Sequence, residues 1–348
     1  MMRTSALSAV LAAVALAGCA AHHRAPHAEP SSPAPSTSPA SRSIPTVKVN
    51  CHRSGAVRVA TADALSTALA RAKPGEMISL APGTYVGDFI ATTSGRDGAP
   101  ITLCGARDAV LQGESIRHGY AFYLKNASWW RLAGFTVMGG QKGVVADHSS
   151  DDIVYGLYVH GTGDEAIHLR EFSTHDLVSH CVIRHTGLLV QFFGEGIYVG
   201  SANKNWCRYT SCKPDRSDDD AIVGNDIADT SAENIDIKEG TTGGSIRGNH
   251  LDGMGMLASA ATAWVDVKGN GWTIRDNTGV DSNGDGFAVH QVYPGWGIGN
   301  VFIGNNAQVD GPGVGIYVQS PALKTVVACS NTVHGAAHGL SNTPCKTP

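Results

Sequence analysis

Charged and aromatic residues are scarce in this sequence. Charged side chains make up 16% of the 348 residues, aromatic side chains make up 7%, and the formal net charge is −4 at pH 7. This balance gives no reason to expect nucleic acid as a partner. Binding of any polyanion would have to rest on a local cluster of cations.

Helical periodicity is also missing over most of the chain, so no βαβ crossover is predicted. Short apolar runs alternate with polar residues at period 2, which is typical of strands. Turn residues separate these runs, and 42 of the residues are Gly. The length would accommodate two or three compact domains, but a continuous repeat argues for one.

The repeat is clearest in four six-residue segments, 233–238, 263–268, 285–290 and 314–319. Their third and fifth positions are always apolar. Their fourth and sixth positions carry Asp/Lys, Asp/Lys, Ala/His and Tyr/Gln. Because side chains alternate across a strand, one face should be buried while the other presents a column of chemical groups.

A second mark recurs in step with these segments. Asn225, Asn249, Asn277 and Asn305 are separated by 249 − 225 = 24, 277 − 249 = 28 and 305 − 277 = 28 residues, a period typical of solenoids. Three short strands and three turns fit each period. Stacked coils would pair about 4.8 Å apart and would align the Asn residues in a hydrogen-bonded ladder. We predict an all-β, right-handed parallel β-helix solenoid from about residue 76 to about residue 340.

The start of the repeat resembles a known superfamily. Residues 78–85 read Ile-Ser-Leu-Ala-Pro-Gly-Thr-Tyr, and they follow Ala-Asp-Ala-Leu at 62–65 and Ala-Lys-Pro-Gly at 72–75. This opening resembles that of the pectin-lyase-like β-helix superfamily. The resemblance spans nearly all of the chain after residue 50 and implies a short N-terminal capping helix over the first coil. It specifies fold better than function.

The N-terminus resembles a bacterial lipoprotein signal. Arg3 precedes an apolar run at 6–16 that is too short to span a bilayer, and Leu-Ala-Gly-Cys follows at 16–19. The resemblance implies a signal peptide at 1–19 that ends at a lipidated Cys19, a disordered tether at 20–46 and a single domain at 47–348. The alternative is a secretory signal cut elsewhere. Acylation would hold the protein on the outer face of a bacterial membrane through lipid alone.

Seven cysteines remain after Cys19, in a compartment where disulfides persist. Sequence alone cannot fix their connectivity, but proximity favours three pairs, Cys207 with Cys212, Cys51 with Cys104, and Cys329 with Cys345. Cys181 then remains free and aligns with Asn225, so we expect it to be buried. A zinc site is disfavoured, because no CxxC pair with matching ligands occurs.

The six-residue alignment extends upstream to 165–170 and 195–200, which predicts three columns on one sheet. The fourth-position column contains His168, Tyr198, Asp236, Asp266, Ala288 and Tyr317. The sixth-position column contains Arg170, Gly200, Lys238, Lys268, His290 and Gln319. Glu165, Glu195, Glu233 and Asp285 stand at the first position.

Lys238 and Lys268 are the candidate catalytic bases of this array, and His290 continues their column. Stacked ammonium groups about 5–7 Å apart should lower one lysine pKa toward that of a general base, an effect that neighbouring aspartates partly reverse. Candidate ligands for a Ca²⁺ ion are Glu233, Asp236 and Asp266, with Glu195 as an alternative. A cation beside an amine base suits β-elimination of a uronic-acid polymer. The alternative is a charge-balanced exposed surface whose pairs contribute little.

Candidate substrate-binding residues flank the charged block. Aromatic rings at Tyr198, Trp264 and Tyr317 are of the kind that stack on sugars. The insertion at 201–220 adds Trp206 and Arg208, which could grip an acidic glycan, and Arg170 continues the cationic column. A solvated loop is the alternative for the insertion, and its acidic run at 218–220 is more typical of a solvated surface than of a calcium site.

The array resembles that of calcium-dependent polysaccharide lyases, namely family-9 pectate lyases and the chondroitinase-B and alginate-lyase group. The resemblance implies a lysine base beside acidic metal ligands. It departs from family 9 in that the adjacent aspartates lie in the insertion, and from the chondroitinase type in that Lys replaces the expected Arg. We predict an outward-facing, monomeric envelope lipoprotein that cleaves an acidic polysaccharide. The alternatives are a β-helix glycoside hydrolase and a non-catalytic glycan-binding or scaffold protein.

Overall fold

A computed structural model of the chain describes residues 49–51 and 53–347. These residues belong to one compact unit, Ile44–Pro348. The expected signal peptide, Cys19 and the whole of the expected tether lie outside the described residues. None of the helices in the described part is long and apolar enough to cross a membrane.

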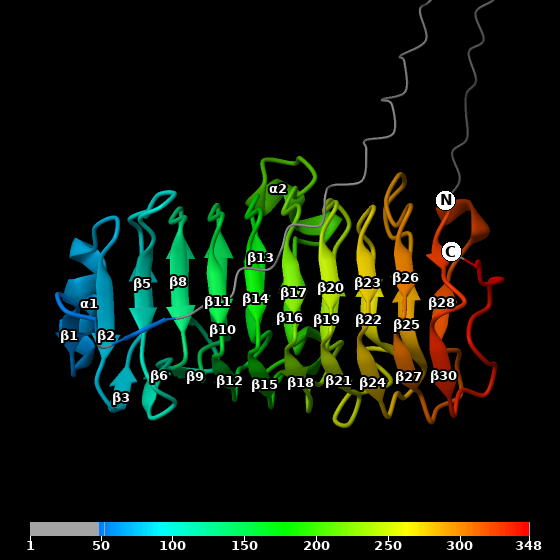
Figure 1. The fold of residues 1–348 in the computed structure, drawn as a ribbon, viewed down its shortest axis with the longest axis horizontal. Coiled ribbons are helices and arrows are strands. Elements are labelled where there is room, and N and C mark those ends of the chain that lie inside the picture. Colours follow the sequence, from blue (N-terminus) through cyan, green and yellow to red (C-terminus); the bar gives the residue numbers. More distant parts are fainter. Residues whose placement is uncertain (1–48, 52, 348) are drawn as a thin grey trace, which may run out of the picture. The chain divides into compact units, whose positions relative to one another are not determined.

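Three parallel sheets form the body of this unit (Figure 1). Sheet A consists of β1 (Val57–Val59), β2 (Met77–Leu80), β5 (Ile101–Cys104), β8 (Trp130–Ala133), β11 (Ile153–Tyr155), β14 (Leu177–Ser179), β17 (Ala221–Val223), β20 (Ser245–Arg247), β23 (Thr273–Arg275), β26 (Val301–Ile303) and β29 (Val326–Val327). Sheet B consists of β3 (Gly83–Val86), β6 (Ala109–Gln112), β9 (Thr136–Met138), β12 (Tyr158–His160), β15 (Val182–Arg184), β18 (Asp226–Ile227), β21 (His250–Asp252), β24 (Thr278–Val280), β27 (Asn306–Gln308) and β30 (Thr332–His334). Sheet C consists of β4 (Phe89–Ala91), β7 (Tyr120–Lys125), β10 (Lys142–Asp147), β13 (Ile167–Arg170), β16 (Ile197–Val199), β19 (Ile235–Ile237), β22 (Ala263–Val267), β25 (Asp285–Val289) and β28 (Ile316–Val318).

The chain visits the sheets in the order A, B, C from β2 onward, so one strand of each sheet makes one coil. Within each sheet, every strand pairs in parallel with the strands one coil before and one coil after it, as β19 does with β16 and β22. Stacking of coils in sequence order confirms the predicted parallel β-helix and its three strands per coil.

Few helical elements interrupt the coils. They are α1 (Ala62–Arg71), η1 (Gln191–Phe193), η2 (Asn203–Asn205), α2 (Trp206–Tyr209) and η3 (Pro321–Leu323). Helix α1 begins after Thr61, whose hydroxyl accepts the Ala64 N–H at 3.2 Å, a standard N-cap. Leu65 and Leu69 lie one turn apart, so both reach the same face and are buried in the hydrophobic core at the β1 end (Figure 1).

The third and fifth positions of the repeat face the interior, as predicted. On β19 and β22 these residues are Ile235, Ile237, Val265 and Val267, and each is 0% exposed. They belong to one continuous core that runs from the first coil to the last.

The predicted asparagine ladder lines the turn between sheets A and B. Asn249 Oδ1 accepts the backbone N–H of Asn225 and its side-chain amide, both at 2.9 Å. The same two bonds recur up the column and end at Asn331, one coil beyond the predicted set. Below Asn225, the Cys181 N–H donates to Asn225 Oδ1 at 2.9 Å. Each rung therefore satisfies a buried backbone N–H.

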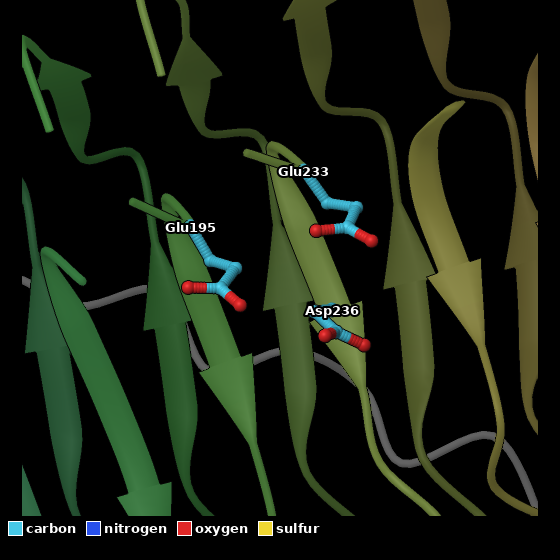
Figure 2. A group of neighbouring side chains, drawn as sticks. All are labelled: Glu195, Glu233 and Asp236. Atoms are coloured by element: carbon cyan, nitrogen blue, oxygen red, sulfur yellow. The ribbon is translucent and has the colours of Figure 1, made fainter. Parts of the chain in front are cut away.

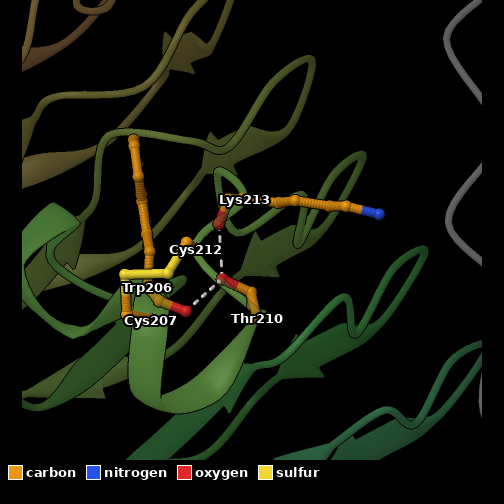
Figure 3. Close-up of a disulfide and its surroundings, with 5 residues drawn as sticks. All are labelled: Trp206, Cys207, Thr210, Cys212 and Lys213. Atoms are coloured by element: carbon orange, nitrogen blue, oxygen red, sulfur yellow. Dashed lines mark hydrogen bonds between the residues drawn. A yellow bond between two sulfur atoms is a disulfide. The ribbon is translucent and has the colours of Figure 1, made fainter.

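The cysteines pair as expected. In the described part of the chain, the disulfides are Cys51–Cys104, Cys207–Cys212 and Cys329–Cys345, and Cys181 is free and buried. Figure 3 shows the Cys207–Cys212 disulfide, beside which the Thr210 hydroxyl donates to the carbonyls of Trp206 and Lys213. Disulfides of this number are typical of proteins outside the cytoplasm, which indicates an extracytoplasmic protein.

Candidate active site

The predicted columns exist on sheet C. The Cα register pairs His168 with Tyr198, Tyr198 with Asp236, and Asp236 with Asp266. It continues from Asp266 to Ala288 and then to Tyr317. Since the strands are parallel and the side chains alternate, these residues share the outer face of sheet C.

A chain of alternating charges connects three successive coils on this face. Asp236 Oδ2 lies 2.5 Å from Lys238 Nζ, and Asp236 Oδ1 lies 2.6 Å from Lys268 Nζ. Lys268 Nζ also lies 2.8 Å from Asp266 Oδ2, while Asp266 Oδ1 lies 2.8 Å from His290 Nδ1. The side chains of Asp236 and Lys268 are 1% and 9% exposed. Because these charges are withdrawn from water, the attraction between them is less screened than in the exposed surface pairs considered as an alternative.

The expected fall in a lysine pKa is wrong. Burial alone would lower the pKa of Lys238, but Asp236 and the nearby Glu195 outweigh it and raise that pKa above its ordinary value. Lys268 behaves in the same way, because Asp236 and Asp266 outweigh both burial and the charge of Lys238. A shared carboxylate between the two ammonium groups therefore decides their protonation, and both are cations in the free protein.

In Asp266 and His290, the other two members of the network, charged neighbours also outweigh the effect of burial on the pKa. Burial would raise the pKa of Asp266, but Lys268 and His290 hold it below its usual range. Burial would lower the pKa of His290, but Asp266 raises it above 6.5. Both shifts favour the charged forms of this pair.

An acidic cluster lies where strands β16 and β19 begin. Carboxylate oxygens of Glu195, Glu233 and Asp236 lie within 4.8 Å of one another (Figure 2). Glu195 is 4% exposed, and within 49–51 and 53–347 its Oε2 has no hydrogen-bond partner. Burial and the neighbouring carboxylates raise the pKa of Glu195 well above its ordinary value and that of Glu233 to about 7.

This cluster fits a hard divalent cation. Ca²⁺ takes six to eight oxygen ligands and accepts water for some of them, and the orphaned Glu195 Oε2 is an oxygen without another role. Asp266, one of the three predicted ligands, does not join the cluster, because it has no carboxylate oxygen within this group of mutually close oxygens. Glu195, predicted as an alternative to Glu233, joins the cluster together with Glu233.

The insertion at 201–220 is fixed to the solenoid by Asp215. This side chain is fully buried and accepts the backbone N–H groups of Glu171 and Phe172 at 3.0 and 2.9 Å. It also accepts the hydroxyls of Ser201 and Ser217 at 2.6 and 3.0 Å. An ordered insertion therefore follows β16 directly, in contrast to a solvated loop.

Trp206 of the insertion meets a second loop from a later coil. Its ring lies 5.1 Å from that of Tyr293, in an edge-on arrangement, and its indole N–H donates to the Ser201 carbonyl at 2.9 Å. Arg216 lies over the Trp296 ring at 6.0 Å. The loops after β16 and β25 thus join at the edge of sheet C where Lys238 and Lys268 lie. Trp206 is only 5% exposed, so it contributes to this wall and offers little surface to a sugar.

Two predicted substrate-binding residues are unavailable. Trp264 is fully buried, and its indole N–H donates to the Val280 carbonyl at 3.0 Å. Its ring turns inward because Gly279 and Gly286 lack the Cβ atoms that would occupy the same space. Trp264 is therefore a core residue, and the prediction that it stacks on a sugar is wrong.

Arg170 is the second unavailable residue. It is 4% exposed, and Asp147 accepts its Nε and Nη2 protons at 2.6 and 3.0 Å. Its guanidinium also lies 4.4 Å from the Tyr209 ring of the insertion. Buried, paired and stacked, Arg170 anchors the insertion and has no free face for an anionic sugar, contrary to the prediction.

The remaining predicted binding residues lie at the surface or close to it. Tyr198 is 8% exposed and lies between the His168 ring, at 4.3 Å, and Lys238 Nζ, at 4.9 Å. Tyr317 is partly exposed, and its ring lies 5.5 Å from that of His290. Arg208 is exposed on the insertion. Burial raises the pKa of Tyr198 well above its ordinary value, an effect increased by Asp236 and Glu195, so its hydroxyl keeps its proton.

Sequence reasoning missed a second charged network on sheet C, which begins one coil upstream of the first aligned segment, 165–170. Lys142 pairs with Glu165, and Glu165 Oε1 lies 3.4 Å from His168 Nδ1. Residues 142–147 fit the six-residue pattern, with Val144 and Ala146 at its apolar positions. Extending the alignment by one coil would have placed Lys142 and Asp147 in the first and sixth columns.

Solved structures resemble this architecture. An alginate lyase from Paenibacillus sp. str. FPU-7 is 34% identical, with a TM-score of 0.73 over 84% of this chain and 96% of that chain. The pectate lyase Pel9A is 18% identical, with a TM-score of 0.57 over 81% and 75% of the two chains. A mannuronic acid specific family 6 lyase from human gut microbiota is 13% identical, with a TM-score of 0.56 over 83% and 78%. A scan against protein-family models found no match, and a search of curated proteins found none.

The fold and these similarities define the class. The protein is a β-helix enzyme of the polysaccharide lyase type within the pectin-lyase-like superfamily. More narrowly, the identity and coverage show that the chain belongs to the family of the Paenibacillus alginate lyase.

Proposed function

We propose that the protein cleaves a uronate-containing polysaccharide by β-elimination on the outer face of sheet C, and that alginate is its first candidate substrate. The contact of Lys238 with both Tyr198 and Asp236 carries this proposal. Family membership supports the reaction class, and the name of the Paenibacillus relative supports the choice of alginate.

The chemistry restricts where the acid and base can lie. In β-elimination a base takes the proton from C5, its electrons form the C4–C5 double bond, and the leaving O4 receives a proton. Since C5 and O4 belong to one sugar residue, the two groups must be close neighbours. Tyr198 and Lys238 come from adjacent coils and are in contact. His290 and Tyr198 are separated by two intervening coils, so they cannot serve one sugar together.

Lys238 suits the base better than Lys268 does. Two carboxylates hold Lys268, whereas one holds Lys238. We assign proton removal to Lys238 and proton donation to Tyr198, whose hydroxyl stays protonated. Lys268 and His290 then supply positive charge for the uronate carboxylate. A divalent cation held by Glu195, Glu233 and Asp236 would neutralise that carboxylate and, by occupying Asp236, would free the Lys238 amine.

The test is an assay with alginate, pectate and chondroitin, each with and without Ca²⁺, that follows the absorbance of unsaturated uronides. Alginate should give the chromophore. New reducing ends without the chromophore would instead identify a hydrolase. Binding without cleavage of any polymer would support the scaffold alternative.

Two substitutions test the assigned residues. Lys238→Ala and Tyr198→Phe should each lower kcat by about 10²-fold or more, in the range for loss of a general acid or base. Lys125→Ala is the matched control, because Lys125 lies at the exposed end of β7 on the same sheet. Full activity of either site variant would contradict the assignment.

We also propose that acylation of Cys19 anchors the enzyme to the outer face of the cell membrane. The lipoprotein-like Leu-Ala-Gly-Cys at 16–19 supports this location. Radiolabelled fatty acid should enter the wild-type protein in cells but not the Cys19→Ser variant. Equal labelling of the two would disprove the anchor.

A further inference from the structure

Three buried aspartates lie one above another in the turn between sheets C and A. Asp152, Asp176 and Asp220 directly precede β11, β14 and β17, and the pairing of those strands sets the three in register. They are 2%, 2% and 0% exposed. None of them belongs to the candidate active site.

One oxygen of each carboxyl group has a clear structural role. The Oδ1 atoms accept backbone N–H groups from the equivalent residue of the preceding coil. The bonds are Trp130 N–H to Asp152 at 2.6 Å, Asp152 N–H to Asp176 at 2.8 Å, and Asp176 N–H to Asp220 at 2.8 Å. The Oδ2 atoms of all three are buried and have no hydrogen-bond partner among the residues that the structure describes.

The same turn shows what such a position requires. Asn300 precedes β26 in this column, and its Oδ1 accepts the Trp272 N–H at 2.8 Å. Its Nδ2 donates to the carbonyl of Gly269, three residues before Trp272, at 3.0 Å. Asn277 in the asparagine ladder likewise donates to Ile246, three residues before Asn249. If an aspartate forms the same Oδ1 bond, its Oδ2 takes the position of the asparagine Nδ2, which faces a backbone carbonyl of the preceding coil.

The electrostatic surroundings oppose ionisation. The charged groups that act most strongly on the three carboxyls are their own neighbours in the stack, together with Asp151, Asp218 and Asp219, all of them acidic. The nearby cationic side chains are engaged elsewhere, Arg216 with Asp218 at 2.7 Å and His175 with Asp219 at 3.7 Å. Burial first, and then these carboxylates, raise the pKa of each stacked aspartate well above its ordinary value.

We infer that Asp152, Asp176 and Asp220 form a ladder of neutral carboxylic acids, which is a binding site for three protons in the wall of the solenoid. Each Oδ2–H donates to a carbonyl of the preceding coil, as the Asn300 amide does. By the same three-residue offset, the acceptors are the carbonyls of Ala127, Ser149 and Ser173.

The ladder makes folding depend on pH. An unfolded Asp has a pKa of about 3.9, so unfolding at neutral pH releases the three protons. The unfolded state then binds fewer protons than the folded state, and the stability falls as pH rises. The contribution of the three bound protons to the unfolding free energy is complete below the unfolded pKa, and it is lost as pH rises through the raised folded pKa values. Over that window, each carboxyl changes the unfolding equilibrium constant up to about tenfold per pH unit.

The test compares the wild type with an Asp152→Asn/Asp176→Asn/Asp220→Asn variant in denaturant unfolding between pH 5 and 9. In a plot of unfolding free energy against pH, the variant should lose the part of the slope that corresponds to three protons. Its side-chain amides donate to the same backbone carbonyls without binding a proton. It should also be at least as stable as the wild type at pH 8. Asp281→Asn is the control, since Asp281 is exposed and is not one of the charged neighbours of the ladder, and the slope of this variant should equal that of the wild type.

A second measurement does not depend on the triple variant. The infrared spectrum of the wild type at neutral pH should contain the C=O stretch of protonated carboxylic acid, and this signal should be reduced in Asp176→Asn. A triple variant that is less stable than the wild type with an unchanged slope would overturn the inference, as would a missing acid band. If a chelator destabilises the wild type but not Asp176→Asn, the ladder holds a buried cation and the inference is wrong.

Discussion

Buried carboxyl groups occur in two regions of this solenoid, and their surroundings are opposite. On sheet C, Asp236 and Asp266 are each in contact with two cationic side chains. In the turn between sheets C and A, the charged groups that act on Asp152, Asp176 and Asp220 are, in the described part of the chain, other acidic groups. Burial is nearly the same in both places.

The difference shows that burial alone does not set the charge of an aspartate. Where a lysine donates to the carboxyl group, the pair stays ionised and its charges are available to a substrate. Where only backbone groups surround it, the carboxyl stays neutral and supports the backbone. The same residue type therefore belongs to the candidate active site in one region and to the structural framework in the other.

The largest contrast should come from one substitution made in both regions. Asp236→Asn leaves Lys238 and Lys268 without their shared partner, and breaking a buried pair costs about 3–5 kcal/mol of unfolding free energy. Asp176→Asn keeps its backbone bond and should cost nothing at pH 8. Denaturant unfolding of the two variants measures this. Equal destabilisation would remove the distinction between the regions.

Calcium should act on the acidic cluster and leave the aspartate ladder unaffected. Binding at Glu195, Glu233 and Asp236 would stabilise the folded protein by about 2.7 kcal/mol at a Ca²⁺ concentration of 100 Kd, seen as a rise in Tm. Glu195→Gln should abolish the rise, because the orphaned Oε2 is lost as a charged ligand. Asp176→Asn is the control and should keep it. A Ca²⁺-induced rise that persists in Glu195→Gln would move the cation elsewhere.

A carboxyl placed in the asparagine ladder should behave like the aspartate ladder. Asn277→Asp keeps the Oδ1 acceptor but loses the amide donor to the Ile246 carbonyl. The cost should be about 1–3 kcal/mol at pH 8 and should shrink as the pH falls and the carboxyl takes up a proton. Asn306→Asp, on the exposed edge of β27, is the control. A cost that does not vary with pH would contradict the proposed role of the proton.

The smallest effect concerns His290. Asp266 raises the pKa of this imidazole, so their pair contributes stability that is full below about pH 6.5 and is lost as pH rises through the folded pKa. Asp266→Asn should return the His290 pKa toward its ordinary value, measured by NMR titration of the ring protons. His250 is the comparison residue, because it lies on sheet B beside Asp226, and the substitution should leave its ring-proton signals unchanged.

Periodicity predicted the fold well because it is a local property. The six-residue pattern gave the correct register of Asp236 with Asp266, and the spacing of Asn225 and Asn249 gave the ladder. The pattern could not show that Trp264 turns inward, because that depends on space left by Gly279 in a different sheet.

Protonation was harder to predict than position. Two stacked lysines suggested a lowered pKa, yet the outcome depends on Asp236 Oδ1 and Oδ2 reaching both ammonium groups. Arg170 similarly pairs with Asp147, one coil earlier, and the six-residue alignment did not include that coil. Pairings between coils depend on side-chain rotamers, which spacing along the chain does not specify.

The final coil has a consequence for how copies of this protein meet. β28 is the last strand of sheet C, and its outer edge is covered by the chain near Ser341. Asn342 donates to the Val318 carbonyl and accepts the Val318 N–H, both at 2.9 Å, and the Cys329–Cys345 disulfide fastens this segment. A bare parallel edge would template a further strand from another molecule. By occupying that edge, the C-terminal segment leaves the end of sheet C paired within its own chain, which opposes pairing of this sheet with a second solenoid.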